Sequence, residues 1–153
     1  MSASAALGQV CESDVPELTA FLRVVDLTVS GLDSPSVRLW VERDGDGEII
    51  GSTGYEISAD SRHALIRSVG VDPSRRSTGR GGGLARFAFA RAAEEGAATA
   101  WLFSRRSGPF WRGLGFAPAD RRELASVLHE THQVRLFQKT GQLEHEVAWS
   151  RPL

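Results

Sequence analysis

Near the middle of this 153-residue chain, a glycine-rich loop joins an apolar stretch to a helical pattern. The apolar stretch is rich in strand formers and ends at a turn, through Leu65, Ile66, Val69, Val71 and then Asp72-Pro73. Glycines follow at positions 79, 81, 82 and 83, and an amphipathic run to Glu95 predicts a helix from about Gly82. A helix start has unpaired N–H groups and a partial positive charge, and glycines leave the main chain open to a ligand. This order of elements predicts a cradle for a diphosphate.

Two common diphosphate loops do not match this stretch. The nucleoside triphosphate loop ends in Gly-Lys-Ser/Thr, whereas Lys139 is the only lysine of the chain. The dinucleotide fingerprint needs a third glycine where Leu84 stands, and the next predicted strand has no acidic residue for the ribose. What does match is the pattern Arg/Gln-x-x-Gly-x-Gly/Ala, in Arg76-Ser77-Thr78-Gly79-Arg80-Gly81.

That pattern resembles the coenzyme A loop of the GNAT acyltransferase superfamily. A strand ending Val69-Gly70-Val71 precedes it, and Trp111-x-x-x-Gly115-Phe116 downstream is similar to the family's Tyr-x-x-x-Gly-Phe. The resemblance implies acetyl-CoA (coenzyme A) as cofactor, held by Val69, Gly70, Val71, Arg76, Ser77, Thr78, Gly79, Arg80, Gly81, Gly82, Ser104 and Trp111. The alternative is a glycine-rich surface loop that binds nothing. Ser104 stands where the family often has an Asn that touches the pantetheine, or is a plain strand-end serine.

The rest of the chain predicts one α/β (α+β) domain over residues 1–153. We expect strands at 7–11, 37–43, 48–57, 64–71, 98–103 and 143–150, and helices at about 14–26, 82–95, 107–114 and 121–130. Asp44-Gly45-Asp46-Gly47 predicts a hairpin turn. The resemblance implies the GNAT fold, a mixed and mostly antiparallel sheet whose central parallel strands splay apart, flanked by helices.

A closer resemblance is to the second type of arsenic-resistance N-acetyltransferase, over about residues 14–141. It rests on four segments: Ala64-Leu-Ile-Arg-Ser-Val69, Pro109-Phe-Trp-x-x-Leu-Gly-Phe116, Arg122 and Thr131-x-Gln133. That family usually continues with Phe and then Cys-Pro, where this chain has Val134 and Phe137-Gln138. Direct binding of As(III) would require several thiolates, and Cys11 is the only cysteine. A natural product or a toxic amino acid is the alternative acceptor.

Composition excludes several other classes of protein. A net charge of −1 argues against a general nucleic-acid or membrane-surface binder. No apolar run approaches the ~20 residues of a membrane span, and no signal peptide is evident, so we expect a cytoplasmic protein. A single cysteine excludes an internal disulfide and a cysteine metal cluster. We expect no metal, and a homodimer is one option for the assembly.

Transfer to an amine needs a group that removes a proton, because an alkylammonium has a pKa of about 10.4. Glu56 is the predicted catalytic base, since its strand neighbours the central one and its carboxylate could face the splay. The alternative is a solvated strand residue. His63 and His132 are secondary candidates, and His129 and His145 are expected to face solvent.

Two further steps of the expected reaction, stabilisation of the thioester oxygen and departure of the thiolate, involve the central strand and position 111. A main-chain N–H between Val69 and Val71 is the expected donor to the thioester oxygen as it gains charge. In many GNAT enzymes the tyrosine at the position of Trp111 protonates the leaving sulfur, and an indole N–H is no practical acid. A thiol with a pKa of about 8.5 can still leave unassisted, at a lower rate. The substitution also motivates the alternative of a catalytically silent coenzyme A-binding regulator or partner protein.

Arg67 and Ser68 are the predicted substrate residues. They follow one another in the central strand and are expected to point to opposite faces, so that one faces the acceptor. Arg67 either holds a substrate carboxylate or pairs with an acidic neighbour. The preferred function is an acyl-CoA-dependent N-acyltransferase acting on a small-molecule amine or amino acid by direct attack on the thioester. A nucleic-acid module is disfavoured by the charge and by the lack of aromatic residues among Arg75, Arg76 and Arg80.

Overall fold

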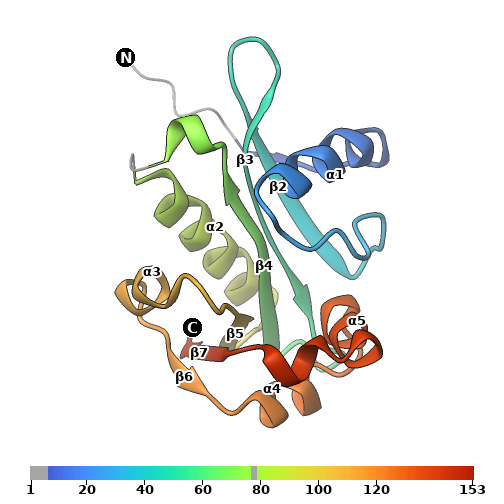
Figure 1. The fold of residues 1–153 in the computed structure, drawn as a ribbon, viewed down its shortest axis with the longest axis vertical. Coiled ribbons are helices and arrows are strands. Elements are labelled where there is room, and N and C mark those ends of the chain that lie inside the picture. Colours follow the sequence, from blue (N-terminus) through green and yellow to red (C-terminus); the bar gives the residue numbers. More distant parts are fainter. Residues whose placement is uncertain (1–6, 77–78) are drawn as a thin grey trace.

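The computed structural model of this chain describes residues 7–76 and 79–153. These residues form a seven-stranded sheet with the order β1-β2-β3-β4-β5-β7-β6 (Figure 1). Within it β4 and β5 run parallel and the other neighbouring pairs are antiparallel, as predicted. In chain order the strands are β1 (Gly8–Gln9), β2 (Val37–Arg43), β3 (Ile49–Ile57), β4 (His63–Val71), β5 (Thr99–Phe103), β6 (Ala117–Ala119) and β7 (Ala148–Pro152).

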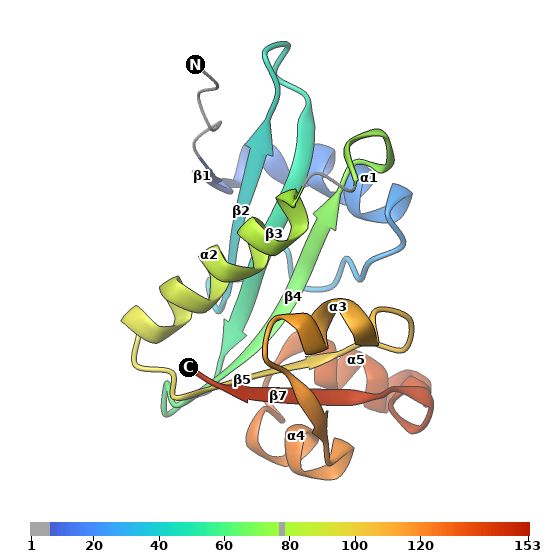
Figure 2. The same ribbon diagram turned by 90° about the vertical axis from the view of Figure 1, so that its left-hand side faces the viewer.

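Helices cover both faces of the sheet. The α-helices are α1 (Val15–Val24), α2 (Arg80–Glu94), α3 (Gly108–Gly113), α4 (Arg121–Val127) and α5 (His132–Thr140). Three short 3₁₀ turns lie between elements, at η1 (Glu12–Asp14), η2 (Pro73–Arg75) and η3 (Gln142–His145). In Figure 2, α2 lies across the near face of the sheet, whereas α1 lies behind it. None of the helices in the described ranges is long and apolar enough to cross a membrane.

Alternation along the central strands divides the apolar residues between the two faces. Ile66 packs with Ala85 and Ala88 of α2, in a cluster that also contains Trp111 of α3. Leu65, the residue before Ile66, packs instead with residues of α4 and α5. A third cluster joins α1 to β2. Trp40, Trp101 and Trp149 are buried in strands, which confirms the prediction that they pack in the core.

The parallel pair separates after three residues. β4 and β5 are in register from His63↔Thr99 to Leu65↔Trp101, although β4 continues to Val71 and β5 to Phe103. On its other side β4 stays paired with β3 as far as Gly51↔Val71. Beyond Leu65, therefore, the edge of β4 that faces β5 has no partner strand in the described part of the chain. This divergence is the predicted splay.

Several boundaries differ from those expected. The last strand begins at Ala148 rather than at residue 143, because 142–145 form a 3₁₀ turn. Two elements were not anticipated, the short strand β6 and the helix α5. Helix α2 begins at Arg80, two residues before the expected start, since Gly79 adopts the left-handed conformation that precedes it (φ 76°).

Candidate acyl-transfer site

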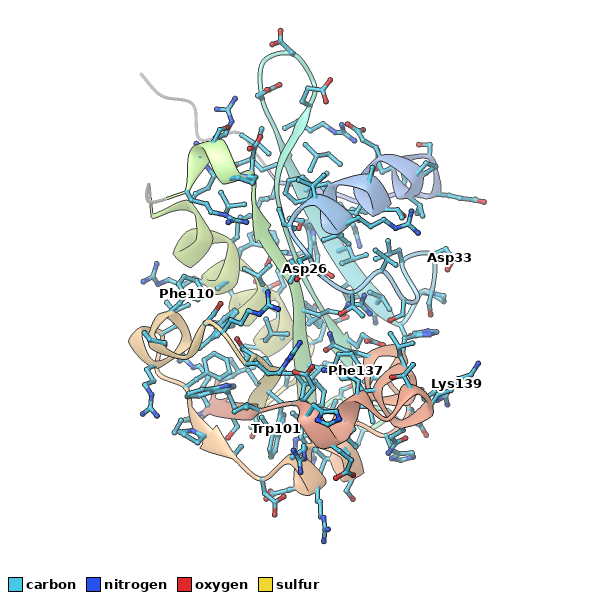
Figure 3. All side chains as sticks on the ribbon, viewed as in Figure 1. Asp26, Asp33, Trp101, Phe110, Phe137 and Lys139 are labelled. Atoms are coloured by element: carbon cyan, nitrogen blue, oxygen red, sulfur yellow. The ribbon has the colours of Figure 1, made fainter. Side chains whose placement is uncertain are left out.

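Two adjoining cavities occupy the space where β4 and β5 separate. The inner cavity, of about 150 Å³, lies between the two strands and is lined by Ser68, Val69, Leu102, Phe110 and Trp111, among others. The outer cavity, of about 470 Å³, is lined by residues such as Asp26, Phe137 and Glu146. The two share six lining residues: Leu27, Thr28, Phe103, Ser104, Ser107 and Gln133. In Figure 3, Asp26 is labelled near the centre, Phe110 on α3 and Phe137 on α5.

The start of α2 lies at the end of β4 and has the character of an anion site. The N-cap residue of this helix is Gly79, which has no side chain to accept a hydrogen bond from the first N–H groups. A Cβ at Gly81 would lie 3.6 Å from the ring of Phe110 and 3.7 Å from Val71, which means that position 81 faces the space between α2 and α3. A larger side chain there would fill that space. Glycine at 79 is needed for a different reason, its positive φ.

The arginines around this helix start are less free than the sequence suggested. Arg80 donates to the carboxylate of Glu42 at 2.5 Å, so its charge is partly neutralised. Arg76 donates through Nε to the carbonyl of Val71 at 3.3 Å. Arg75 pairs with Asp44 at 3.4 Å. Ser77 and Thr78, two of the predicted coenzyme contacts, lie outside the described residues.

Arg86 is a cation that the sequence analysis missed. It lies one helical turn after Gly82, and a Cβ added at Gly82 would be 3.2 Å from its guanidinium. The spacing of four residues along α2 was the available signal, because residues i and i+4 share a helix face. Arg86 is exposed, so it adds positive charge beside the helix start without being tied to the core.

A β-bulge reshapes β4 at the inner cavity. The register with β3 shifts between Ser52↔Gly70 and Gly54↔Arg67, and Ser68 has a positive φ of 61°. The bulge interrupts the alternation of two, so the prediction that Arg67 and Ser68 face opposite sides is wrong. Arg67 Nε instead donates to Ser68 Oγ at 3.2 Å, and both residues line the inner cavity with Val69. Gly70 faces Val25 and Leu27.

Two further predicted coenzyme residues lie on the β5 side of the splay. Ser104 follows β5 and lines both cavities, and its Oγ accepts the N–H of Ser107 at 3.1 Å. Trp111 is 8% exposed and packs edge-on against Phe110 and Phe116, with ring centroids 4.8 and 5.4 Å away. Its indole therefore forms part of the wall of the inner cavity and of the core at once.

Glu56 does not line either cavity, contrary to the expectation that it faces the splay. Its side chain is 1% exposed, and it pairs with Arg67 at 3.0 Å between Oε2 and Nη1. The same carboxylate accepts main-chain N–H bonds from His132 at 2.6 Å and Gln133 at 3.2 Å. Burial lowers the pKa of Arg67, and the charge of Glu56 opposes that shift. Both oxygens of Glu56 are thus engaged, and the carboxylate joins β4 to the start of α5.

The histidines are also away from the two cavities. His63 Nδ1 accepts a hydrogen bond from Trp101 Nε1 at 3.1 Å and lines a separate cavity with Thr131. The ring of His132 lies against Gly31. His129 and His145 are exposed, as predicted.

Residues from distant parts of the chain form the acceptor end of the space. Thr28 comes from the segment after α1, Gln133 from the first turn of α5, and Glu146 from the segment before β7. Glu146 is 9% exposed and is held by Gln142 Nε2 at 2.7 Å and by Arg105 at 3.4 Å. Gln133 was noticed only as part of Thr131-x-Gln133. No local pattern pointed to Thr28 or Glu146, because only the folded chain brings them together.

Comparison of the sequence with models of protein families shows the family of this chain. The model described as the acetyltransferase (GNAT) family matches residues 9–116, which is more than half of the chain. The chain belongs to the acetyltransferase (GNAT) family. A search of the curated proteins found no match.

Solved structures share the GNAT fold with this chain. N-acetylglutamate synthase of Neisseria gonorrhoeae, solved with coenzyme A and N-acetyl-glutamate, has a TM-score of 0.73 and 17% identity over 100% of this chain. A Mycobacterium tuberculosis protein, solved with coenzyme A, has a TM-score of 0.71 and 16% identity over 97% of this chain and 99% of its own. Nourseothricin acetyltransferase has a TM-score of 0.63 and 17% identity over 98% of this chain and 99% of its own. The chain spans about a third of the length of the N-acetylglutamate synthases.

The GNAT family uses acetyl-CoA, and the residues of this chain fit that cofactor. The start of α2, whose N-cap is a glycine, and the bare position at Gly81 suit paired phosphates. The unpaired edge of β4 beyond Leu65 leaves main-chain groups for an extended arm between the strands. No group of three or more His, Cys, Asp or Glu side chains that could hold a metal ion occurs within residues 7–76 and 79–153.

Proposed function

We propose that this chain is an acyl-CoA-dependent N-acyltransferase that acts on the amine of a small molecule or amino acid, with residues 1–153 as one catalytic domain. The observation that carries the proposal is the end of the β4–β5 register at Leu65↔Trp101 beside the bare start of α2. When bound, acetyl-CoA supplies the acyl group as a thioester. The chain supplies the phosphate cradle, the donors along β4 and the acceptor cavity.

The donor side relies on the main chain. N–H groups at the start of α2, from Arg80 to Gly82, bind the phosphates, and Arg76 and Arg86 add positive charge nearby. An N–H between Val69 and Val71, after the bulge, donates to the thioester oxygen as it gains negative charge. Ser104 and Trp111 form the opposite wall.

The route of proton transfer is assigned from the positions of Glu56, Glu146 and Trp111. Glu56 stays the base predicted from sequence only if its carboxylate gives up donors from Arg67, His132 or Gln133. We instead assign proton removal to solvent in the outer cavity, where Glu146 lies. Trp111 has no acidic proton to give, so the thiolate leaves without help from this residue and takes a proton from water.

The acceptor is a small amine. The resemblance to the second type of arsenic-resistance N-acetyltransferase supports a small-molecule acceptor rather than a protein. An arsenic compound bound through thiolates is disfavoured, because Cys11 is exposed and lines a different cavity, beside β1 and β2. A primary amine of a natural product or toxic amino acid suits the outer cavity, which holds two aromatic rings and two carboxylates that pair with Arg105 and Arg106 of the same lining.

The test measures thiol release from acetyl-CoA with the purified chain across a panel of amines. The panel contains the proteinogenic amino acids, alkylamines and arylalkylamines. Amine-dependent thiol release with a matching N-acetyl product by mass spectrometry supports the proposal. Calorimetry with coenzyme A, run beside it, measures binding without turnover.

The second candidate is a GNAT-fold protein that binds coenzyme A without transferring an acyl group. Trp111 favours it, because a buried indole stands where many relatives have the acidic tyrosine. Tight coenzyme A binding with no thiol release for any amine would select this function over the first.

A further inference from the structure

We infer that Gln133 is a substrate-contacting residue of the acceptor site, whose side-chain amide oxygen accepts an N–H of the amine. This inference rests on the proposed N-acyltransferase function and names the group that would recognise the acceptor. Gln133 belongs to the first turn of α5 and lines both the inner and the outer cavity.

The amide of Gln133 is only half satisfied by the protein. Its residue exposure is 8%, and Nε2 donates to Thr28 Oγ1 at 2.9 Å. Oε1 is buried and has no hydrogen-bond partner among the residues that the structure describes. Buried polar atoms are nearly always paired, because an unpaired one loses its hydration without replacement. An oxygen left unpaired on the wall of two cavities therefore points to a donor group on a ligand.

The fold holds this amide in place from several elements. Glu56 of β3 accepts the main-chain N–H of Gln133, and Thr131 Oγ1, at the N-cap of α5, accepts the N–H of Val134 at 3.3 Å. Arg67 of β4 pairs with Glu56 and donates through Nη2 to the carbonyl of Thr28 at 3.3 Å. The buried Glu56–Arg67 pair thus fixes both Gln133 and the residue that orients its amide. Such a fixed acceptor is suited to orienting a nucleophile.

The surroundings indicate the chemical class of the ligand. The carboxylates of Glu146 and Asp26 also line the outer cavity and can accept hydrogen bonds from an amine, although Arg105 and Arg106 of the same lining pair with them at 3.4 and 3.3 Å. Phe103 and Phe137 form an apolar wall, with ring centroids 5.2 Å apart. These groups fit a primary amine on an apolar skeleton. An amide oxygen is too weak a base to remove the proton of an ammonium, so Gln133 binds and orients the amine.

The experiment compares three substitutions in the full chain. The amine is the member of the panel with the highest wild-type kcat/KM, measured by thiol release at saturating acetyl-CoA. Gln133→Met removes the amide, Gln133→Glu keeps an acceptor oxygen and replaces the NH2 group by a second one, and Thr28→Val removes the hydroxyl that orients the amide. Gln138→Met, an exposed position on the same helix, is the matched control.

We expect Gln133→Met to raise the KM for the amine on the order of 10-fold, the loss of about one hydrogen bond. Thr28→Val should raise it less, and Gln133→Glu should stay within about threefold of wild type, because the Thr28 hydroxyl can turn to donate to the new carboxylate. The KM for acetyl-CoA, the Kd for coenzyme A and the thermal midpoint of Gln133→Met should stay as in wild type. Gln138→Met should change none of these values.

Three results would overturn the inference. If the KM for the amine in Gln133→Met equals that of wild type, Gln133 does not contact the amine. If this KM rises as much in Gln133→Glu as in Gln133→Met, the side-chain oxygen does not act as the acceptor. A parallel loss of coenzyme A affinity would make Gln133 a structural residue. If wild-type protein binds coenzyme A yet acetylates no amine, the N-acyltransferase function itself fails, a result distinct from the other three.

Discussion

The two halves of the candidate site are built by different means. On the coenzyme side, the important groups are main-chain N–H groups at the start of α2 and along the free edge of β4. On the acceptor side, a buried ion pair between side chains of β3 and β4 holds main-chain groups of α5 and of the segment after α1. Ligand binding in the coenzyme half requires positions without side chains, which leave the main chain accessible. The geometry of the acceptor half requires contacts between buried side chains.

This difference predicts how each half can be damaged. A side chain added to the coenzyme half should block the ligand and leave the fold intact, because position 81 faces the space between α2 and α3 and a Cβ there makes only ordinary contacts. Removing one partner of the ion pair in the acceptor half should destabilise the fold, because the other partner stays buried without its counter-charge.

The largest effect is expected for Glu56→Gln, which leaves Arg67 buried without its counter-charge. Removing one partner of a buried pair costs about 3–5 kcal/mol, so the free energy of unfolding in urea should fall by that order. Since Glu56 lies outside both cavities, the shape of the pH–rate profile should stay as in wild type. Adding Arg67→Met to this variant should restore part of the stability. A normal stability with a shifted pH–rate profile would return Glu56 to the role of base.

Gly81→Glu tests the opposite case, the addition of a side chain. It places bulk and negative charge where the phosphates are expected, so coenzyme A affinity by calorimetry should fall at least ~100-fold, or about 2.7 kcal/mol. The thermal midpoint should not fall, since a carboxylate in the first turn of a helix is stabilising. Gly81→Ala is the control, because its Cβ makes only ordinary contacts at 3.6 and 3.7 Å. Unchanged coenzyme A affinity in the glutamate variant would separate this loop from the coenzyme.

The same difference explains what the sequence could and could not reveal. The coenzyme half is continuous in the chain, so the strand, the glycines and the helix could be predicted together from residues 64–95. The acceptor half joins Thr28, Glu56, Arg67 and Gln133, and no spacing in the sequence relates them. Glu56 was correctly placed in the neighbouring strand, but the face it occupies depends on the partners that α5 supplies.

The bulge in β4 marks a second limit. The alternation of side chains along a strand predicted opposite faces for Arg67 and Ser68. The local sequence Arg67-Ser68-Val69 gives no indication that Ser68 has a positive φ. Ser52 stabilises the bulge from β3 by donating to the carbonyl of Ser68 at 2.6 Å. A strained backbone of this kind is set by tertiary contacts, so it lies outside what local propensity can reveal.

Trp111→Tyr tests whether an acidic side chain at position 111, in the cavity wall on the β5 side, can protonate the leaving thiolate. Trp111→Phe is the matched control, because the two variants differ only by the phenol hydroxyl. Both should lose some stability, since Trp111 packs against Phe110 and Phe116. If protonation of the leaving thiolate limits the rate, kcat should be on the order of 10-fold higher for the tyrosine variant than for the phenylalanine variant. Equal kcat values would show that this position has no acid role to fill.

The smallest effect is expected at the turn that leads into the coenzyme loop. Asp72 accepts hydrogen bonds from the N–H and hydroxyl of Ser74, each at 3.0 Å, and the main-chain bond is the first cause of its lowered pKa. Because the pKa is lower in the folded chain, this contribution is complete above the unfolded value of about 3.9 and is lost as the pH falls through the folded value. At pH 7, Asp72→Asn should lower the thermal midpoint by about 2 °C. The difference from wild type should vanish in strong acid.

Asp60→Asn is the matched control, since Asp60 holds the β3–β4 turn at the other end of β4 in the same way and also has a lowered pKa. Both variants should lose a similar amount of thermal stability. Only Asp72→Asn should weaken coenzyme A binding, by about twofold, because its turn positions the residues that precede α2. Equal coenzyme A affinities in the two variants would mean that the loop keeps its shape without this turn, and that the helix start alone defines the coenzyme half.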